Sequence, residues 1–266
     1  MARSVPAPEP DVSRPAGAAG KGSPFDFVGR MSAVVAILPV ARDAAHAMLP
    51  AGLQLAAQAF VPGDRHPIVL ILGRQSDVRP SAVPLGAGYL EFILAVPFVE
   101  HRGGEPQGPF CYCPRLFLDR HLPTLAGRLL YGYAKRRATM RMTERSYRIA
   151  DPAGGELLSA EFRTSGAALD PAQSGAASLL GLPVISRAAN GWWYSRADLG
   201  LERAVVQPVE LDLVIHRPFV SGLPVGAFTI SGVEGAPSRA LRIRTSWRLA
   251  GPWARRSPPP LLEPDR

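Results

Sequence analysis

Apolar and polar residues alternate with a period of two over much of this 266-residue chain. Such alternation is typical of β-strands, because successive side chains of a strand point to opposite faces of the sheet. The clearest stretch covers residues 136–150 (RRATMRMTERSYRIA), and five strong turn formers follow it at 151–155. A second apolar stretch at 156–164 completes the predicted β-hairpin.

The rest of the chain has the same character, with short apolar stretches between turns. It predicts a mainly antiparallel β protein with a few peripheral helices (α+β), arranged as a barrel or a sandwich. No glycine-rich phosphate loop follows a strand, so a nucleotide-binding fold is not expected. Short helices are expected at 41–48 and 123–131, and further strands at 31–39, 67–73, 87–99, 110–119, 179–186, 205–216 and 240–249.

The two ends of the chain differ from its middle. Residues 1–23 are too rich in proline, alanine, glycine and serine to bury a core, and residues 257–266 form a proline-rich tail. We expect a single domain over residues 24–256. The leader lacks the apolar run of a secretory signal, and no window is long and apolar enough for a membrane span. These features predict a soluble, cytoplasmic protein with no membrane partner.

The charge of +8 could indicate a nucleic-acid-binding protein. However, the arginines are scattered, and the densest basic run is only 135–137. We therefore interpret the charge as a solvated surface with some anion-binding positions, and expect no nucleic-acid partner. The only cysteines, Cys111 and Cys113, are too close for an ordinary disulfide and lack the further ligands of a zinc site. We expect buried thiols and no metal.

Lysine is almost absent from this chain. Of its 30 basic residues only Lys21 and Lys135 are lysines, and Lys21 lies in the leader. Unlike arginine, a lysine can lose its proton and attack a carbonyl carbon, so Lys135 is a candidate nucleophile. Its aromatic and aliphatic neighbours, and the adjacent Arg136 cation, disfavour the ammonium form. The alternative is a lysine that extends from the sheet into solvent beside two arginines.

The surroundings of Lys135 resemble those of a known family. Gly127-Arg128, followed by the basic pair Lys135-Arg136 after an aromatic residue, is similar to the motif of the acetoacetate decarboxylase family. In that family the first lysine of the pair forms a Schiff base. The resemblance continues in the same order over roughly residues 28–250, through the segments Tyr89–Glu91, Ala95–Pro97, Leu118-Asp119 with Pro123, Leu211–His216 and Leu223–Val225.

This resemblance implies a cone-shaped β-barrel, a homo-oligomer, a small-molecule keto acid substrate and no cofactor. It also implies roles for four residues. Lys135 would form the imine, Glu91 would orient a proton or a water molecule, and Arg30 would bind the substrate carboxylate. Arg136, in place of the second lysine, would tune the basicity of Lys135.

Some positions depart from the family pattern. Ala134 stands in place of a proline, and Leu129 in place of a glutamate. The family's second active-site carboxylate falls on apolar residues near Leu70–Leu72, which puts decarboxylation in doubt more than imine formation. The sequence therefore predicts a Schiff-base-forming lyase that acts on a β-keto acid or a related keto acid. Two alternatives stay open, namely an aldolase or dehydratase on the same lysine, and a non-catalytic small-molecule-binding relative.

Overall fold

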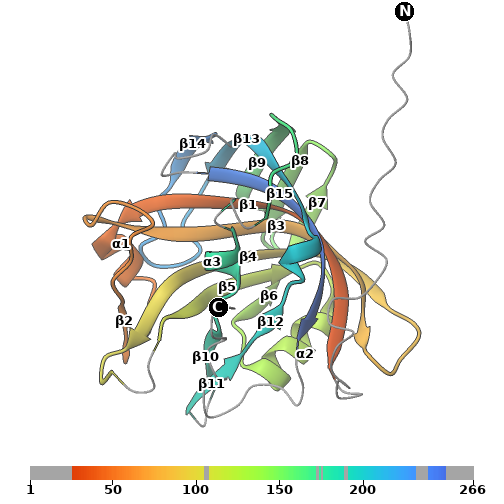
Figure 1. Cartoon of the computed structure of the whole chain (residues 1–266), viewed down its shortest axis with the longest axis horizontal. Helices are drawn as coiled ribbons and strands as arrows, with labels where there is room; N and C mark the ends of the chain where they lie inside the picture. Colours follow the sequence, from red (N-terminus) through yellow and green to blue (C-terminus); the bar gives the residue numbers. More distant parts are fainter. Residues whose placement is uncertain are drawn as a thin grey trace, which may run out of the picture.

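The described residues form one large, twisted β-sheet and three short helices (Figure 1). The computed structural model describes residues 26–104, 108–171, 174, 176–188, 191–231 and 239–249. The predicted leader 1–23 and tail 257–266 lie outside these ranges. No helix in them is both long and apolar enough to cross a membrane.

The helices are α1 (Arg42–His46), α2 (His121–Tyr131) and α3 (Ala176–Leu180), with one 3-10 turn at Leu201–Arg203. The strands are β1 (Phe27–Ala41), β2 (Leu53–Leu55), β3 (Arg65–Pro80), β4 (Ala87–His101), β5 (Phe110–Leu118), β6 (Lys135–Arg137), β7 (Thr139–Met142), β8 (Ser146–Ala150), β9 (Glu156–Thr164), β10 (Val184–Ala188), β11 (Gly191–Ser195), β12 (Ala197–Asp198), β13 (Val205–Ile215), β14 (Gly226–Ile230) and β15 (Arg239–Leu249).

The strand order along the sheet is β11-β10-β5-β4-β3-β1-β15-β13-β9-β8-β7, with β2, β6, β12 and β14 paired beside this path. Every pair is antiparallel except β5 with β10 and β5 with β6. The predicted antiparallel β fold is therefore confirmed. The path of the described strands does not return from β7 to β11, so the expected closed barrel is not confirmed.

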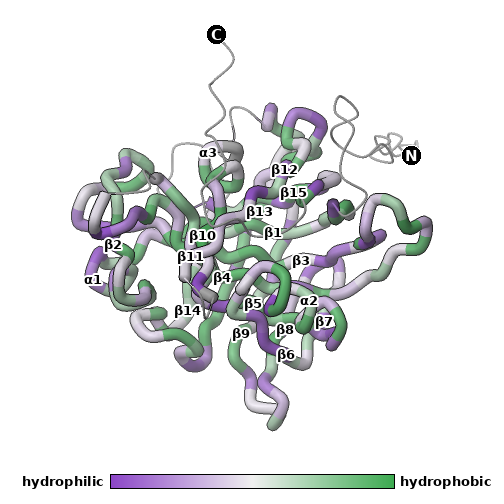
Figure 2. The backbone as a smooth tube through the Cα atoms, turned by 90° about the horizontal axis from the view of Figure 1, so that it is seen from below, coloured by the Kyte–Doolittle hydropathy of each residue, from purple (hydrophilic) through white to green (hydrophobic). Residues whose placement is uncertain are grey.

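Both faces of the central strands are buried. On β1, Val34, Ala36 and Leu38 pack into one apolar core, whereas Met31 and Val35 belong to a second core on the other face. This explains why the strand is continuously apolar from Ala33 to Ala41 (AVVAILPVA) instead of alternating. Figure 2 shows the hydrophobic stretches gathered on strands in the middle of the molecule, such as β4 and β5. The cavity described below opens within the second core.

Two predicted elements differ from the structure. Residues 179–186 were expected to be one strand, but Leu179 and Leu180 end α3, and the strand β10 begins only at Val184. An apolar run this short suits a helix or a strand equally, and Gly181 and Pro183 break it. The long strand expected from Arg136 is instead three short ones, β6, β7 and β8, so that Lys135 begins a strand of only three residues.

Candidate active site

Lys135 lies where α2 returns the chain to the sheet. Gly132 ends the helix with a left-handed backbone (φ 64°), a conformation that suits glycine. The chain then enters β6, where Lys135 pairs with Leu116 of β5. Its side chain is only 9% exposed. This helix-to-strand position agrees with the sequence-based expectation, and it excludes a lysine extended into solvent.

The helix leaves room for this lysine at a single glycine. A Cβ atom added to Gly127 of α2 would lie 2.4 Å from Cδ of Lys135 and 2.9 Å from its Nζ. Real Cβ contacts are not this short, so any larger residue would displace the amine. The glycine of the Gly127-Arg128 motif thus allows the helix to lie directly against the lysine side chain.

The amine faces a buried carboxylate. Lys135 Nζ lies 3.2 Å from Oε1 of Glu91, which projects from β4 and is 7% exposed. Two residues that sequence analysis missed hold this carboxylate in place. Gln75 of β3 donates from Nε2 to Glu91 Oε2 over 3.1 Å, and the indole N–H of Trp247 on β15 donates to Gln75 Oε1 over 2.8 Å. Four strands therefore meet at one polar chain.

Around this pair lies an apolar cavity of about 230 Å³. Aliphatic and aromatic side chains from β1, β3, β4, β5, β10, β15, α2 and α3 line it. Val69 and Ile71 occupy the β3 wall near the place where the resemblance lacks a second carboxylate. Among the described lining residues, Glu91 is the only carboxylate and Lys135 the only strong base.

Tyrosine and cysteine side chains also line the cavity. Burial raises the pKa of the Tyr133 hydroxyl, which shares a 2.6 Å hydrogen bond with Ser195 Oγ. The Tyr133 ring lies under the amine, with its centroid 5.8 Å from Lys135 Nζ. Cys111 and Cys113 are free thiols in the same wall. A hydrogen bond to Cys111, and then burial, raise the pKa of Cys113, so it stays a protonated thiol of low reactivity.

The other two residues expected at the site lie elsewhere. Phe27 and Met31 of β1 line the cavity, whereas Arg30 points to the opposite face of the strand and is exposed. The structure therefore does not bring Arg30 to Lys135. Arg136 is likewise exposed, one residue further along β6, and does not line the cavity.

The sequence matches a known protein family. The profile of the family described as acetoacetate decarboxylase matches residues 11–190. The chain belongs to the acetoacetate decarboxylase family. A search of curated proteins finds no match. Among the described residues, no group of three or more histidine, cysteine, aspartate or glutamate side chains could hold a metal ion.

Several solved structures share the fold. The enduracididine biosynthesis enzyme MppR complexed with pyruvate is 13% identical, with a TM-score of 0.62, and the match covers 91% of this chain and 93% of MppR. An acetoacetate decarboxylase-like enzyme from Sphingomonas wittichii is 14% identical, with a TM-score of 0.62 and coverage of 88% and 94%. The acetoacetate decarboxylase from Legionella pneumophila is 15% identical, with a TM-score of 0.60 and coverage of 88% and 87%.

Proposed function

We propose that this protein is a Schiff-base-forming lyase that acts on an apolar β-keto acid through Lys135. The observation that carries the proposal is the burial of one amine opposite one carboxylate in an otherwise apolar cavity. A structural lysine would not need a cavity at its amine, or a glycine that clears the helix from its side chain. Membership of the acetoacetate decarboxylase family supports an enzyme.

The reaction would begin with proton transfer from the Lys135 ammonium to Glu91, whose Oε1 lies within reach. The amine lone pair then attacks the substrate carbonyl carbon, and the carbonyl oxygen leaves as water, which gives an iminium ion. The bond to the carboxylate breaks, its electron pair moves into the iminium to form an enamine, and carbon dioxide departs. Loss of the water uses the proton that Glu91 accepted, so the enamine carbon takes its proton from solvent, relayed through Glu91. Hydrolysis of the resulting iminium ion then releases the ketone and the amine.

The cavity walls favour the loss of carbon dioxide in this scheme. No arginine lines the cavity among the described residues, so a bound carboxylate lacks a charge clamp next to the iminium. A carboxylate is poorly solvated in an apolar site, whereas carbon dioxide is neutral. The volume of about 230 Å³ also suits a substrate with an aliphatic or aromatic substituent better than one with only a methyl group.

A second candidate function is aldol or dehydratase chemistry on the same lysine. Val69 and Ile71 line the cavity near the position where the resemblance places the family's second carboxylate, so the site holds one acid fewer. Among proteins with this fold, MppR was solved with pyruvate and with the condensation product of pyruvate and imidazole 4-carboxaldehyde. A relative that binds small molecules without catalysis is the third possibility.

The test compares carbon dioxide release with condensation. The purified protein is incubated with β-keto acids of increasing apolar size, and separately with 2-keto acids plus an aldehyde. We expect carbon dioxide release that is fastest with an aliphatic or aromatic substituent and absent in Lys135→Met. Condensation without carbon dioxide release would favour the aldolase, and neither product from any substrate would contradict catalysis by this site.

We also propose that the protein forms a homo-oligomer through the outer face of α2. Leu122, Leu125 and Leu129 recur at helical spacing on this face and are 80%, 54% and 65% exposed, and the first two also border a larger hollow beside Lys135. A second copy of the same face would cover them. Sedimentation of the wild type and of a Leu122→Ser/Leu129→Ser variant checks this. Identical masses for the two proteins would contradict the proposed interface.

A further inference from the structure

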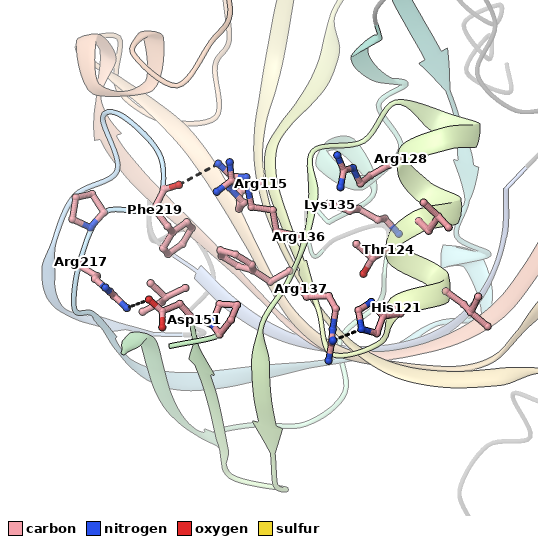
Figure 3. A pocket seen from close by; sticks show the side chains of 16 residues that line it. Arg115, His121, Thr124, Arg128, Lys135, Arg136, Arg137, Asp151, Arg217 and Phe219 are labelled. Atoms are coloured by element: carbon pink, nitrogen blue, oxygen red, sulfur yellow. Dashed lines mark hydrogen bonds and ion pairs between the residues drawn. The ribbon is translucent and has the colours of Figure 1, made fainter. Parts of the chain in front are cut away.

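A second and larger hollow, of about 740 Å³, lies beside Lys135 along α2. Its walls carry five arginines, Arg115 of β5, Arg128 of α2, Arg136 and Arg137 of β6, and Arg217 after β13. Figure 3 shows these side chains gathered around the hollow, while the amine of Lys135 points away from Arg115 and Arg136 toward α2. We call this hollow the arginine cleft.

Positive charge in the arginine cleft is barely balanced. Asp151 is its only acidic lining residue within the described ranges, and Arg217 donates to it over 2.5 Å. Arg137 faces His121, which supplies no negative charge. Within the same ranges, Arg115, Arg128 and Arg136 form no ion pair. Like charges held this close repel one another unless an anion lies between them.

Arg115 is the strongest sign of a missing partner. It is half-buried, and its Nε is buried without a hydrogen-bond acceptor among the described residues. Its only hydrogen bond there is a long one, 3.5 Å from Nη2 to the carbonyl oxygen of Phe219. Burial, and then the Arg136 charge, lower the pKa of Arg115. A buried donor without an acceptor is unfavourable, and an oxyanion in the arginine cleft would relieve it.

The start of α2 adds to the same field. His121 and Thr124 from its first two turns line the arginine cleft. The helix has no acidic residue in its first turn, and no side chain caps its first amide groups. The partial positive charge of this helix end is therefore not offset by a carboxylate of its own.

We propose that the arginine cleft binds a polyanionic group built from phosphate oxyanions, such as a diphosphate. A single carboxylate would occupy a small part of about 740 Å³ and would offset only one of the unpaired guanidinium groups. Two linked phosphates offer enough oxygens to contact Arg115, Arg128 and Arg136 together, with paired hydrogen bonds that suit the planar guanidinium. This inference goes beyond the proposed function and does not need the imine.

The binding test uses inorganic pyrophosphate and the full chain, with calorimetry at constant ionic strength. We expect saturable binding that acetate does not displace. Arg128→Gln, at an exposed position, should weaken binding about tenfold, the worth of one charge-assisted hydrogen bond. The control is Arg145→Gln, in the turn at the opposite end of β8 from Asp151, and it should bind like the wild type.

Two outcomes would overturn the proposal. One is the absence of saturable binding to the wild type, and the other is equal binding by Arg128→Gln and Arg145→Gln. Arg136→Gln, also at an exposed position, is an independent variant, and it should weaken pyrophosphate binding as Arg128→Gln does. Because Arg115 is half-buried, its replacement can also destabilise the fold. Binding by Arg115→Gln is therefore compared with that of the wild type only if the two proteins unfold at the same temperature.

The phosphate group could belong to the substrate or to a separate effector, and a further experiment, which rests on the proposed function, distinguishes them. If the group belongs to the substrate, a phosphorylated β-keto acid should react faster than its phosphate-free counterpart, and Arg128→Gln should remove the advantage. If it belongs to an effector, pyrophosphate should change the rate of the phosphate-free substrate. The calorimetric result stands whether or not any turnover is seen.

Discussion

The apolar cavity and the arginine cleft meet at Lys135 but differ in almost every physical respect. The cavity is small, and its one amine is paired with one carboxylate. The cleft is about three times larger by volume and holds five guanidinium groups with one carboxylate. Lys135 and Arg136 are adjacent on β6, yet their side chains lie on opposite faces of the strand. Within this strand of three residues, Lys135 can thus serve chemistry in the cavity while Arg136 and Arg137 serve anion binding in the cleft.

The largest effect should come from Lys135 itself. Lys135→Met keeps the apolar stem but removes the amine, so we expect complete loss of turnover while pyrophosphate binding in the cleft persists. The change also leaves Glu91 buried without its cation, which should lower the free energy of unfolding by about 3 kcal/mol. The double variant Lys135→Met/Glu91→Gln should recover most of that stability. Turnover assays and urea unfolding of the wild type, the single variant and the double variant check this. Equal stability of the single and double variants would show that the unpaired Glu91 carboxylate does not destabilise the fold.

Gly127→Ala tests the fit of the helix against the lysine. Alanine normally favours a helix over glycine by about 1 kcal/mol. Here the new Cβ would overlap the Lys135 side chain, so we expect a loss of about 1–3 kcal/mol in the free energy of unfolding and a much slower reaction. Gly63→Ala is the control, because nothing lies within 4 Å of a Cβ at that position. A Gly127→Ala protein that is as stable and as active as this control would contradict the close packing.

Gln75→Leu tests the chain of hydrogen bonds behind Glu91. The change removes the donor to Glu91 Oε2 and leaves the half-buried Trp247 N–H without its acceptor. We expect a loss of about 1–2 kcal/mol in stability and a slower turnover with little change in KM, because the carboxylate loses its orientation. The matched control is Gln54→Leu, which breaks a Gln54–Glu100 bond of 2.8 Å outside the cavity. If both variants lose turnover equally, Gln75 has no positioning role.

The smallest effect on the reaction should come from Arg136→Ala. Its guanidinium is exposed and lies across the strand, where water screens its charge. Because Arg136 does not line the cavity, its removal should leave the rate of the reaction nearly unchanged. Pyrophosphate binding should fall in the same variant. A large fall in the reaction rate with unchanged pyrophosphate binding would contradict this division of roles between cavity and cleft.

The sequence carries the fold and part of the site. Alternating apolar and polar residues indicate strands with one buried face, and the turns between them predict antiparallel pairing. Lys135 is conspicuous because it is the only lysine outside the leader. Glu91 came from the resemblance alone. Gln75 and Trp247 could not be found, since they lie 172 residues apart and have no motif in common.

Side chains alternate between the two faces of a strand, and this explains why Arg30 lies away from the cavity. Arg30 lies within one residue of Met31 and within three of Phe27, yet only those two face the cavity. Whether a strand residue points inward depends on a register that no motif fixes at a single position. The arginine cleft was beyond prediction for another reason. Its members are spread from residue 115 to residue 217, and only the folded sheet brings them together.

The most direct test of the central claim is mass spectrometry after borohydride reduction in the presence of apolar β-keto and 2-keto acids. The account predicts one covalent adduct per chain, located on the peptide that contains Lys135, and no adduct in Lys135→Met. Because Lys21 is the only other lysine, a reacted side chain is assigned without ambiguity. A folded wild-type protein that shows no adduct at Lys135 with any of these acids would contradict the account.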